Sequence, residues 1–317
     1  MGLLWAVYTA HKHLLLKAFA LVILTTTLSI SANRMDRCIN WKGCGLSEPV
    51  GRVYNGKPIT REEVPWLVFI YVHSNTSKGN ACGGSIITRN VILTAAHCLN
   101  TYPRPKKVSV WFNSTTFRGN VLQATKMVMH PRFVGNFLDK LHDIALLKLP
   151  LKLKFNSIMK PVCLPERDIH VMGKPLTVVG TGWTEAADQL SQRAMYAQVY
   201  AMKKKYCLRP SLRSSITRAN WWPVQRRAPI ICAKGKNTTA CPGDSGGPMT
   251  LKDKNGRWTQ VGVVSHGVLF ECNPRYPATY TRVALYTGWI KKMLNNPSKW
   301  RKLQFNGEVG KLTIKNK

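Results

Sequence analysis

The sequence predicts an all-β protein, an antiparallel barrel or sandwich with one helix near the C-terminal end. Short runs rich in β-branched and aromatic residues alternate with clusters of Gly, Pro and Asn, which is typical of antiparallel strands joined by turns. Only Tyr286–Leu294 carries apolar residues at a convincing helical spacing. The clearest expected strands are Trp66–His73, Val91–Thr94, Val108–Phe112, Ile144–Leu149, Leu176–Val179 and Gln260–Ser265.

The composition is that of a globular but strongly basic chain. Of its 317 residues, 44% are apolar and 9% aromatic, which does not fit low-complexity disorder. The 47 Lys and Arg residues exceed the 14 Asp and Glu residues, so the formal net charge is +33. Such a charge attracts polyanions such as nucleic acid, sulfated glycans or anionic membranes, or it serves only solubility and nonspecific adhesion.

The N-terminal residues 1–32 have the pattern of a signal peptide. Met1–Lys17 is sparsely cationic without an acid, an apolar run covers Ala18–Ile30, and Ser31 and Ala32 are small residues suited to cleavage. A retained signal anchor is the alternative, but this run is short for a membrane span. We therefore expect a secreted, extracellular protein with no transmembrane span in its mature form.

Export makes the nine cysteines candidates for a disulfide framework with one cysteine left over. Asn75, Asn113 and Asn237 each begin an Asn-X-Ser/Thr sequon, which can carry an N-glycan. At the other end, Ser298–Lys317 is basic and weakly patterned, and we expect a loose tail there.

Three short stretches carry the residue types of nucleophilic catalysis. His97 follows an apolar run and precedes a cysteine, Asp143 precedes the apolar run 144–149, and Ser245 lies in a glycine-rich turn. A serine hydroxyl attacks well only when a base takes its proton, an imidazole can do so near neutral pH, and a buried carboxylate fixes that imidazole. Each stretch alone is commonly a packed histidine, a cap or a loop. All three in this order predict a His97–Asp143–Ser245 triad.

The chain resembles the trypsin- and chymotrypsin-like serine proteases over nearly all of Val53–Asn296. The resemblance rests on the three stretches above and on four further ones: Cys82–Ile87, Pro161–Pro165, Gly182-Trp183 and Tyr280–Val283. It implies two antiparallel six-stranded β-barrels with the active site between them. It also implies an oxyanion hole made by the backbone N–H groups of Gly243 and Ser245, and a supporting role for Ser265 beside Asp143.

The resemblance further implies activation of a precursor. The residues from Val53 match the new N-terminus that this family makes by cleavage, and Arg52 implies an activating protease with a preference for basic residues. The freed ammonium of Val53 would pair with Asp244. We thus expect a signal peptide at 1–32, an activation segment at 33–52, a protease domain at 53–297 and a tail at 298–317.

Four disulfides follow from the same resemblance, and one of them would tether the activation segment after cleavage. Cys38 remains as the odd cysteine, and its state is left open. The implied pairs are Cys44–Cys163, Cys82–Cys98, Cys207–Cys232 and Cys241–Cys272.

The expected specificity pocket departs from that of trypsin-like enzymes. Thr239 stands where those enzymes need an Asp to pair with Lys or Arg, because an unpaired cation does not tolerate burial. With Ala240, Gly267 and Ala278 it predicts a preference for a neutral, medium-sized apolar residue before the cut. Pro242, before the oxyanion glycine, and His266, in place of a tryptophan, are two further departures.

Two function classes remain open. The first is an active endopeptidase that acts on proteins or peptides and needs no cofactor and no metal, since the calcium loop of some relatives lacks its carboxylates here. The second is a weak or inactive homologue that binds a polyanion such as a sulfated glycan. The basic span Lys203–Lys236, with Trp221 and Trp222 in its middle, is either a binding exosite or a solvated loop. The intact triad favours the enzyme; the oligomeric state is left open.

Overall fold

The computed structural model describes residues 39–48, 59–73, 79–102, 104–112, 119–135, 140–180, 182, 194–207, 229–241, 243–267 and 274–303, together with the helical Lys17 and Phe19. Residues 1–38 and 39–317 form separate units, and the second holds all the structure below. No helix within the described residues is long and apolar enough to cross a membrane.

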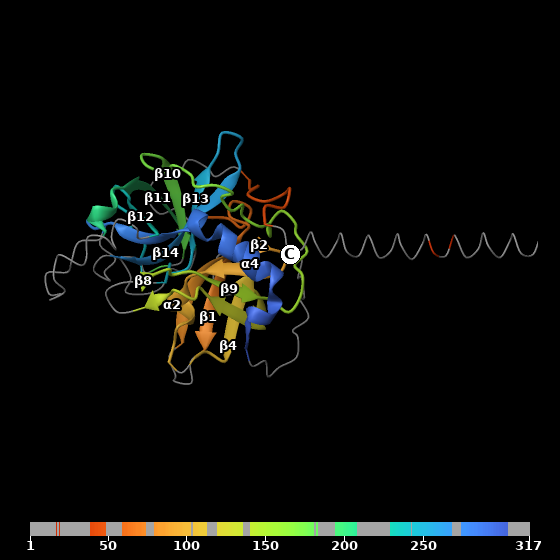
Figure 1. The fold of residues 1–317 in the computed structure, drawn as a ribbon. Coiled ribbons are helices and arrows are strands. Elements are labelled where there is room, and N and C mark those ends of the chain that lie inside the picture. The colour runs from red at the N-terminus through yellow and green to blue at the C-terminus, as the bar shows by residue number, and fades with distance from the viewer. Residues whose placement is uncertain are drawn as a thin grey trace, which may run out of the picture. The chain divides into compact units, whose positions relative to one another are not determined.

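The first half of this unit, together with β16 from near its C-terminal end, forms an eight-stranded antiparallel sheet (Figure 1). Its strands pair in the order β16-β6-β9-β3-β2-β1-β4-β5. Most are runs of Val, Ile, Leu and Phe that pack into one core, as expected for strands buried on both faces. The strands are β1 (Leu67–His73), β2 (Asn80–Thr88), β3 (Val91–Thr94), β4 (Lys107–Phe112), β5 (Asn120–Gln123), β6 (Lys126–Met129), β9 (Ala145–Lys148) and β16 (Arg301–Lys302).

The second half closes into a six-stranded barrel with the order β10-β11-β12-β15-β14-β13. Its core is a separate cluster that includes Leu176, Val199, Ile231 and Tyr280. The strands are β10 (Pro175–Gly180), β11 (Met195–Met202), β12 (Ile230–Lys234), β13 (Pro248–Lys252), β14 (Trp258–Gly267) and β15 (Ala278–Arg282).

Short elements connect and cover these sheets. The helix predicted at Tyr286–Leu294 is α4 (Thr287–Asn295), whose Ile290, Met293 and Leu294 are buried in the core of the first sheet. The others are α2 (Ala96–Leu99), the hairpin β7 (Val134–Gly135) and β8 (Lys140–Leu141), and the 3₁₀ turns η1 (Lys204–Tyr206), η2 (Val283–Tyr286) and η3 (Pro297–Lys299).

The all-β fold with a C-terminal helix is confirmed, with two differences. The first sheet has eight strands rather than six, because β5 and β16 add to its two edges. One of these, β16, lies in the segment expected to be a loose tail. Residues 298–303 instead pack against the first sheet. Trp300 and Leu303 are each only 6% exposed, and the Leu303 N–H donates to the Thr125 carbonyl over 2.9 Å. The residues after 303 lie outside the described part.

Three of the four expected disulfides join described residues: Cys44–Cys163, Cys82–Cys98 and Cys207–Cys232. The first ties the segment 39–48 to the body of the unit, where the Trp258 N–H also donates to the Gly45 carbonyl and the Gly45 N–H to the Pro161 carbonyl, each over 2.8 Å. Cys241 is disulfide-bonded as well, but its expected partner, Cys272, lies outside the described residues.

Candidate active site

His97 and Asp143 meet because two paired strands bring them to one end of the first sheet. Thr94, the last residue of β3, is the Cα partner of Ala145, the first residue of β9. His97 therefore lies three residues beyond β3 in α2, opposite Asp143 just before β9. The His97 backbone N–H donates to Asp143 Oδ1 over 2.8 Å, and His97 Nδ1 lies 2.7 Å from Oδ2.

Asp143 is completely buried yet held in its charged form. Burial acts to raise the pKa of this carboxyl. The charge of His97 and hydrogen bonds from His97 and Ser265 outweigh burial, so the net pKa lies below its ordinary value. A carboxylate that stays ionised can fix the orientation of an imidazole and stabilise its protonated form.

The second barrel supplies two of the groups that hold Asp143. Ser265 of β14 donates its hydroxyl to Asp143 Oδ2 over 2.6 Å. Thr281 of β15 donates its hydroxyl to the Asp143 backbone carbonyl over 2.7 Å. The sequence singled out Ser265, but it gave Thr281 no role; its place in the Tyr280–Val283 stretch was the available signal. The carboxylate on the first sheet is thus clamped by the second barrel.

A β-bulge in β14 extends this network to His266. Neighbouring side chains of a strand normally point to opposite faces, but the pairing of β14 with β15 shifts register between Val264 and His266. Ser265 Oγ and His266 Nδ1 consequently lie 3.0 Å apart. Since the only hydroxyl proton of Ser265 goes to Asp143, Ser265 can only accept from His266. This assigns the Nδ1–H tautomer to His266.

His266 is neutral around physiological pH. Burial and, to a lesser extent, the nearby charge of Lys140 lower its pKa to about 4, against a weaker opposing effect of Asp143. A neutral Nδ1–H tautomer has an unprotonated Nε2. His266 therefore acts here as a donor to Ser265 without adding a positive charge beside the Asp143 carboxylate.

Ser245 lies in a tight turn between β12 and β13 that packs against the first sheet. The Gly83 N–H of β2 donates to the Ser245 carbonyl over 2.7 Å, and Sγ of Cys98 lies 3.7 Å from the same oxygen. Gly243 and Gly246 have φ of 98° and 81°, a conformation that favours glycine. A Cβ on Gly246 would also stand 2.5 Å from the Gly83 carbonyl oxygen, so a side chain there would push the turn off β2.

The Asp244 carboxylate occupies a buried cradle of backbone. Its two oxygens accept the N–H groups of Gly182 over 2.6 Å and Cys241 over 2.9 Å. A Cβ at Gly180 or Gly182 would come within 2.4 Å of those oxygens, which explains the glycines. Burial raises the pKa of Asp244 to about 6, although the two N–H groups lower it.

The four residues of the expected specificity pocket lie on or beside the second barrel. Gly267 and Ala278 are Cα partners on β14 and β15, and Ala278 is buried. Ala240 is buried and Thr239 half-buried in the segment that leads from β12 into the Ser245 turn.

Some sequence-predicted residues lie outside the described residues: Pro242, Arg52, Val53 and most of the basic span 203–236. Of the three sequons, Asn237 is exposed on a bend, while Asn75 and Asn113 lie outside the described part.

A histidine pair that the sequence did not single out lies next to Asp143. The rings of His130 and His142 stack with centroids 5.1 Å apart, and the Tyr286 hydroxyl contacts His142 Nδ1 at 2.9 Å. Trp289 contacts the His130 ring edge-on. Burial, the neighbouring His142 and Arg132 together lower the pKa of His130 to about 4, and burial and Arg132 lower that of His142. This packing, contributed largely by η2 and α4, covers the outer side of the Asp143 segment.

The described residues offer one group of possible metal ligands, Cys82, His97 and Cys98. The two sulfurs are joined in a disulfide, so they cannot serve as thiolate ligands.

An antiparallel sheet and a six-stranded barrel, with a serine turn and a His–Asp pair where they meet, are the arrangement of the chymotrypsin-like class of serine hydrolases. The family model described as trypsin matches residues 53–290, and the chain belongs to this family. It is a chymotrypsin-like serine endopeptidase.

Several relatives lie at about 30% identity. Phenoloxidase-activating factor 1 of Holotrichia diomphalia is 31% identical over 84% of this chain and 76% of the relative. CLIP domain-containing serine protease B4 of Anopheles gambiae is 34% identical over 78% and 71%. Chymotrypsin-C of Mus musculus is 31% identical over 77% and 89%. Among solved structures, HL collagenase is 25% identical, covers 77% of this chain and 99% of its own, and gives a TM-score of 0.62.

The His266 contact predicts different behaviour for two substitutions of similar size. His266→Leu removes the donor to Ser265, and we expect kcat/KM to fall about tenfold, the effect of one lost hydrogen bond. His266→Asn keeps a donor at the same place and should stay within about threefold of the parent protein. Without the His266 donor, Ser265 should donate a weaker hydrogen bond to Asp143. The Asp143 carboxylate should then hold the His97 proton more tightly in the leucine variant. The acidic limb of the kcat/KM profile should then move to higher pH. Equal rates and equal profiles for both variants would show that the contact has no influence.

The partly buried histidines also predict acid sensitivity of the fold. His130 and His266 bind protons less readily in the folded state (pKa about 4) than in the unfolded state (6.5). The unfolded state therefore binds more protons between these values, and stability falls as pH drops from 6.5 to 4. Asp244, with its raised pKa, opposes this change below pH 6. We expect a net loss of about 2 kcal/mol, measured by urea unfolding across this range.

The matched control for this pH effect uses one half-buried and one exposed histidine. His130→Gln should flatten the pH dependence of the free energy of unfolding, because it removes one titrating ring. His170 is exposed, so His170→Gln should leave the pH dependence unchanged. Identical pH dependence in the two variants would contradict the assignment to these half-buried rings.

Proposed function

We propose that Ser245 is the nucleophile of this endopeptidase, with His97 as its general base and Asp143 as the group that orients His97. Ser245 attacks the carbonyl carbon of the peptide bond while His97 Nε2 takes the hydroxyl proton. The C–N bond then breaks as His97 returns that proton to the leaving amine. A water molecule, deprotonated by the same imidazole, hydrolyses the acyl-enzyme. The observation that carries this proposal is the bidentate His97–Asp143 contact at the end of β3, with Ser265 as a third donor.

The backbone N–H groups of Gly243 and Ser245 form the oxyanion hole in this proposal. Two such donors stabilise the negative charge that develops on the substrate oxygen, typically by about 3 kcal/mol each. The positive φ of Gly243 supports this role, because it lets the peptide turn where an L-side chain would strain it. The anchoring of the Ser245 carbonyl on Gly83 holds the turn in one position.

The enzyme is made as a precursor that is cut between Arg52 and Val53, by a protease with a preference for basic residues. The new ammonium of Val53 pairs with Asp244 and shapes the oxyanion turn. The buried state of Asp244 supports this step, since an isolated buried carboxylate is costly and two N–H groups offset only part of that cost. The Cys44–Cys163 disulfide keeps the cleaved segment attached.

The specificity pocket accepts a neutral, medium-sized apolar side chain rather than Lys or Arg. Thr239 supplies no charge at its floor, and the buried Ala278 opposite Gly267 supports a pocket narrower than one lined by two glycines. The substrates are proteins or peptides. That a relative is named a phenoloxidase-activating factor supports a protein substrate. Removal of residues 1–32, secretion, and N-glycans on the three sequons complete the proposal.

Replacement of the nucleophile tests the triad and the pocket together. The Ser245→Ala protein should fold with the same disulfides but lose at least about 10⁴-fold in hydrolysis rate, because no hydroxyl remains to attack. Both proteins are cut after Arg52 and incubated with a diverse peptide mixture, and the products are identified by mass spectrometry. New ends after apolar residues, absent with the variant, are expected. Ends after Lys or Arg would refute the pocket, and equal products from both proteins would refute the triad.

Replacement of Arg52 tests activation. Trypsin treatment of the parent protein should generate a chain that begins at Val53, together with peptidase activity. Arg52→Gln should prevent both, while Arg61→Gln, a nearby arginine of an exposed turn, should not. The two pieces of the activated protein should separate on electrophoresis only after reduction, because Cys44–Cys163 joins them. Full activity of the uncut Arg52→Gln protein would contradict a precursor.

A further inference from the structure

Asp143 lies at the apex of a tight three-residue turn. The Ile144 N–H donates to the His142 carbonyl over 2.9 Å, and this bond between residues two apart defines a γ-turn with Asp143 at its centre. His142 enters the turn with a φ of 53°, a left-handed conformation that is uncommon for a residue with a Cβ. Such a conformation persists only where surrounding contacts hold it. The contacts of His142 therefore also set the direction in which the Asp143 carboxylate points.

The side chain of His142 is held by Tyr286 of η2. The Tyr286 hydroxyl and His142 Nδ1 lie 2.9 Å apart, and Tyr286 is only 3% exposed. Burial raises the pKa of the Tyr286 hydroxyl, while burial and the charge of Arg132 lower the pKa of His142, so both groups are neutral around pH 7. The contact is thus a hydrogen bond between neutral groups that is largely shielded from water.

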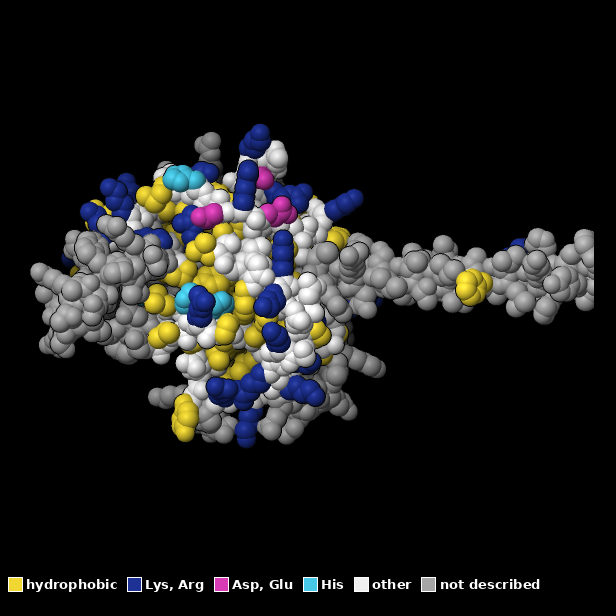
Figure 2. Space-filling model, in the orientation of Figure 1, with side chains coloured by type: hydrophobic (Ala, Val, Ile, Leu, Met, Phe, Trp, Pro, Cys, Tyr) yellow, Lys and Arg dark blue, Asp and Glu magenta, His cyan; other side chains and the backbone are white. Residues whose placement is uncertain are grey.

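Aromatic rings pack around this hydrogen bond. The His130 ring stacks on His142 and meets the Tyr286 ring edge-on, in both cases with centroids 5.1 Å apart, and Trp289 contacts His130 from α4. Figure 2 shows histidine side chains surrounded by hydrophobic ones beside α4. The packing supplies no hydrogen bond to the His142 side chain. In the described part of the chain, Tyr286 is therefore its only polar partner.

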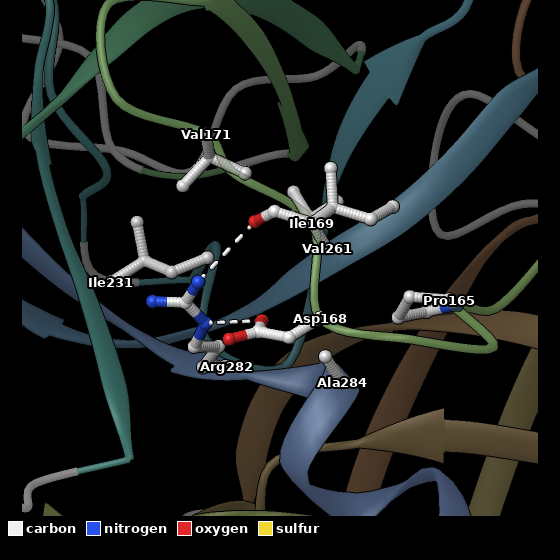
Figure 3. Close-up of a pocket in the computed structure, with 8 residues that line it drawn as sticks. All are labelled: Pro165, Asp168, Ile169, Val171, Ile231, Val261, Arg282 and Ala284. Atoms are coloured by element: carbon white, nitrogen blue, oxygen red, sulfur yellow. Dashed lines mark hydrogen bonds and ion pairs between the residues drawn. The ribbon is translucent and has the colours of Figure 1, made fainter.

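Tyr286 is itself fixed by contacts on both sides along the chain. Before it, the Arg282 guanidinium at the end of β15 donates to Asp168 Oδ1 over 2.8 Å, and this pair lines a small hollow of the second barrel (Figure 3). After it, the Thr287 hydroxyl donates to the Pro165 carbonyl over 2.9 Å. The Tyr286 hydroxyl therefore has a fixed position, to which His142 is tied.

Other bonds hold the turn on its far side. The His130 N–H donates to the Ile144 carbonyl over 3.0 Å, and the Thr281 hydroxyl donates to the Asp143 carbonyl over 2.7 Å. Both act on backbone atoms at or after the apex. The hydroxyl from η2 acts on a side chain before the apex, where the conformation is the strained one.

We propose that Tyr286 is a positioning residue for peptide hydrolysis, and that it acts through His142 on the direction of the Asp143 carboxylate. This inference rests on the proposed role of Asp143 as the group that orients His97. When the His142 side chain is released, its left-handed conformation loses the contact that holds it, and the γ-turn relaxes. The carboxylate then meets His97 in a poorer geometry. Proton transfer from Ser245 is slowed, while the binding of the peptide stays the same.

The test uses variants of the full chain, activated by cleavage after Arg52. Tyr286→Phe removes the hydroxyl and keeps the ring. His142→Gly removes the partner of that hydroxyl and tolerates the left-handed conformation. His142→Asn tolerates it too and returns a polar atom to the place of Nδ1. Tyr196→Phe is the matched control, because the Tyr196 hydroxyl accepts from Thr177 over 3.2 Å between β10 and β11.

We expect Tyr286→Phe and His142→Gly each to lower kcat about tenfold with KM within about twofold, the effect of one hydrogen bond lost from the reaction step. The double variant should be no slower than either, because both changes remove the same contact. His142→Asn should stay within about threefold of the parent protein, and Tyr196→Phe within about twofold. A Tyr286→Phe rate equal to the parent's, two losses that multiply, or an asparagine variant as slow as the glycine variant would overturn the inference.

The Asp143→Asn background separates this inference from the proposed triad. In that background Tyr286→Phe should not slow the residual hydrolysis further, because the carboxylate on which it acts is gone. A further tenfold loss would show that Tyr286 serves only the fold. A slow Asp143→Asn protein beside a fast Tyr286→Phe protein would refute this inference alone. Parent rates for Asp143→Asn would refute the triad and this inference with it.

Proton NMR of the uncut chain gives a readout that needs no activity. The proton between His97 Nδ1 and Asp143 Oδ2, which lie 2.7 Å apart, reports the geometry of that bond. Its resonance should shift in Tyr286→Phe and in His142→Gly and stay unchanged in Tyr196→Phe. Because the two changes remove the same contact from opposite sides, either one that folds decides the outcome. An unchanged resonance in a folded variant would overturn the proposal.

Discussion

The buried carboxylate of Asp143 is the group on which the arrangement of this molecule depends. A charge in a fully buried position is tolerated only when hydrogen-bond donors surround it, and here the donors come from both halves of the chain. His97 approaches from the first sheet, while Ser265 approaches from the second barrel and Thr281 fixes the adjacent backbone. Any relative shift of the two halves would remove some of these donors and leave the Asp143 carboxylate buried without them. The same contacts that keep Asp143 ionised therefore lock the halves into one register.

Close backbone approach makes the second contact between the halves. The Ser245 turn meets β2 where Gly83, Gly246 and Gly247 leave no room for side chains, and the hydrogen bond from Gly83 fixes it there. Asp244 is enclosed in a similar way by Gly180 and Gly182. These glycines are needed for the space they leave, and at Gly246 also for its backbone conformation.

Much of this could be read from the sequence, because local patterns determine it. Alternation and turn residues predicted the strands, and a 3.6-residue period predicted α4 within one residue at each end. What escaped prediction depends on long-range pairing. Residues 298–303 looked like a tail because a two-residue strand has no periodicity, and only Trp300 and Leu303 marked it. The Ser265–His266 contact arises from a bulge, and the His130–His142 stack joins separate segments, so neither has a local signature.

The position of β16 bears on how the chain is made. The strand that borders β6 comes from residues 301–302, so the sheet built from the first half of the chain is completed by residues near its end. During synthesis, β6 leaves the ribosome long before its partner exists, and its backbone groups remain unsatisfied on that side. The first sheet therefore keeps an unpaired edge until almost the whole polypeptide has been synthesised. The lysines on that edge protect it against aggregation in the meantime, because their positive charges repel a second nascent chain that could pair with it.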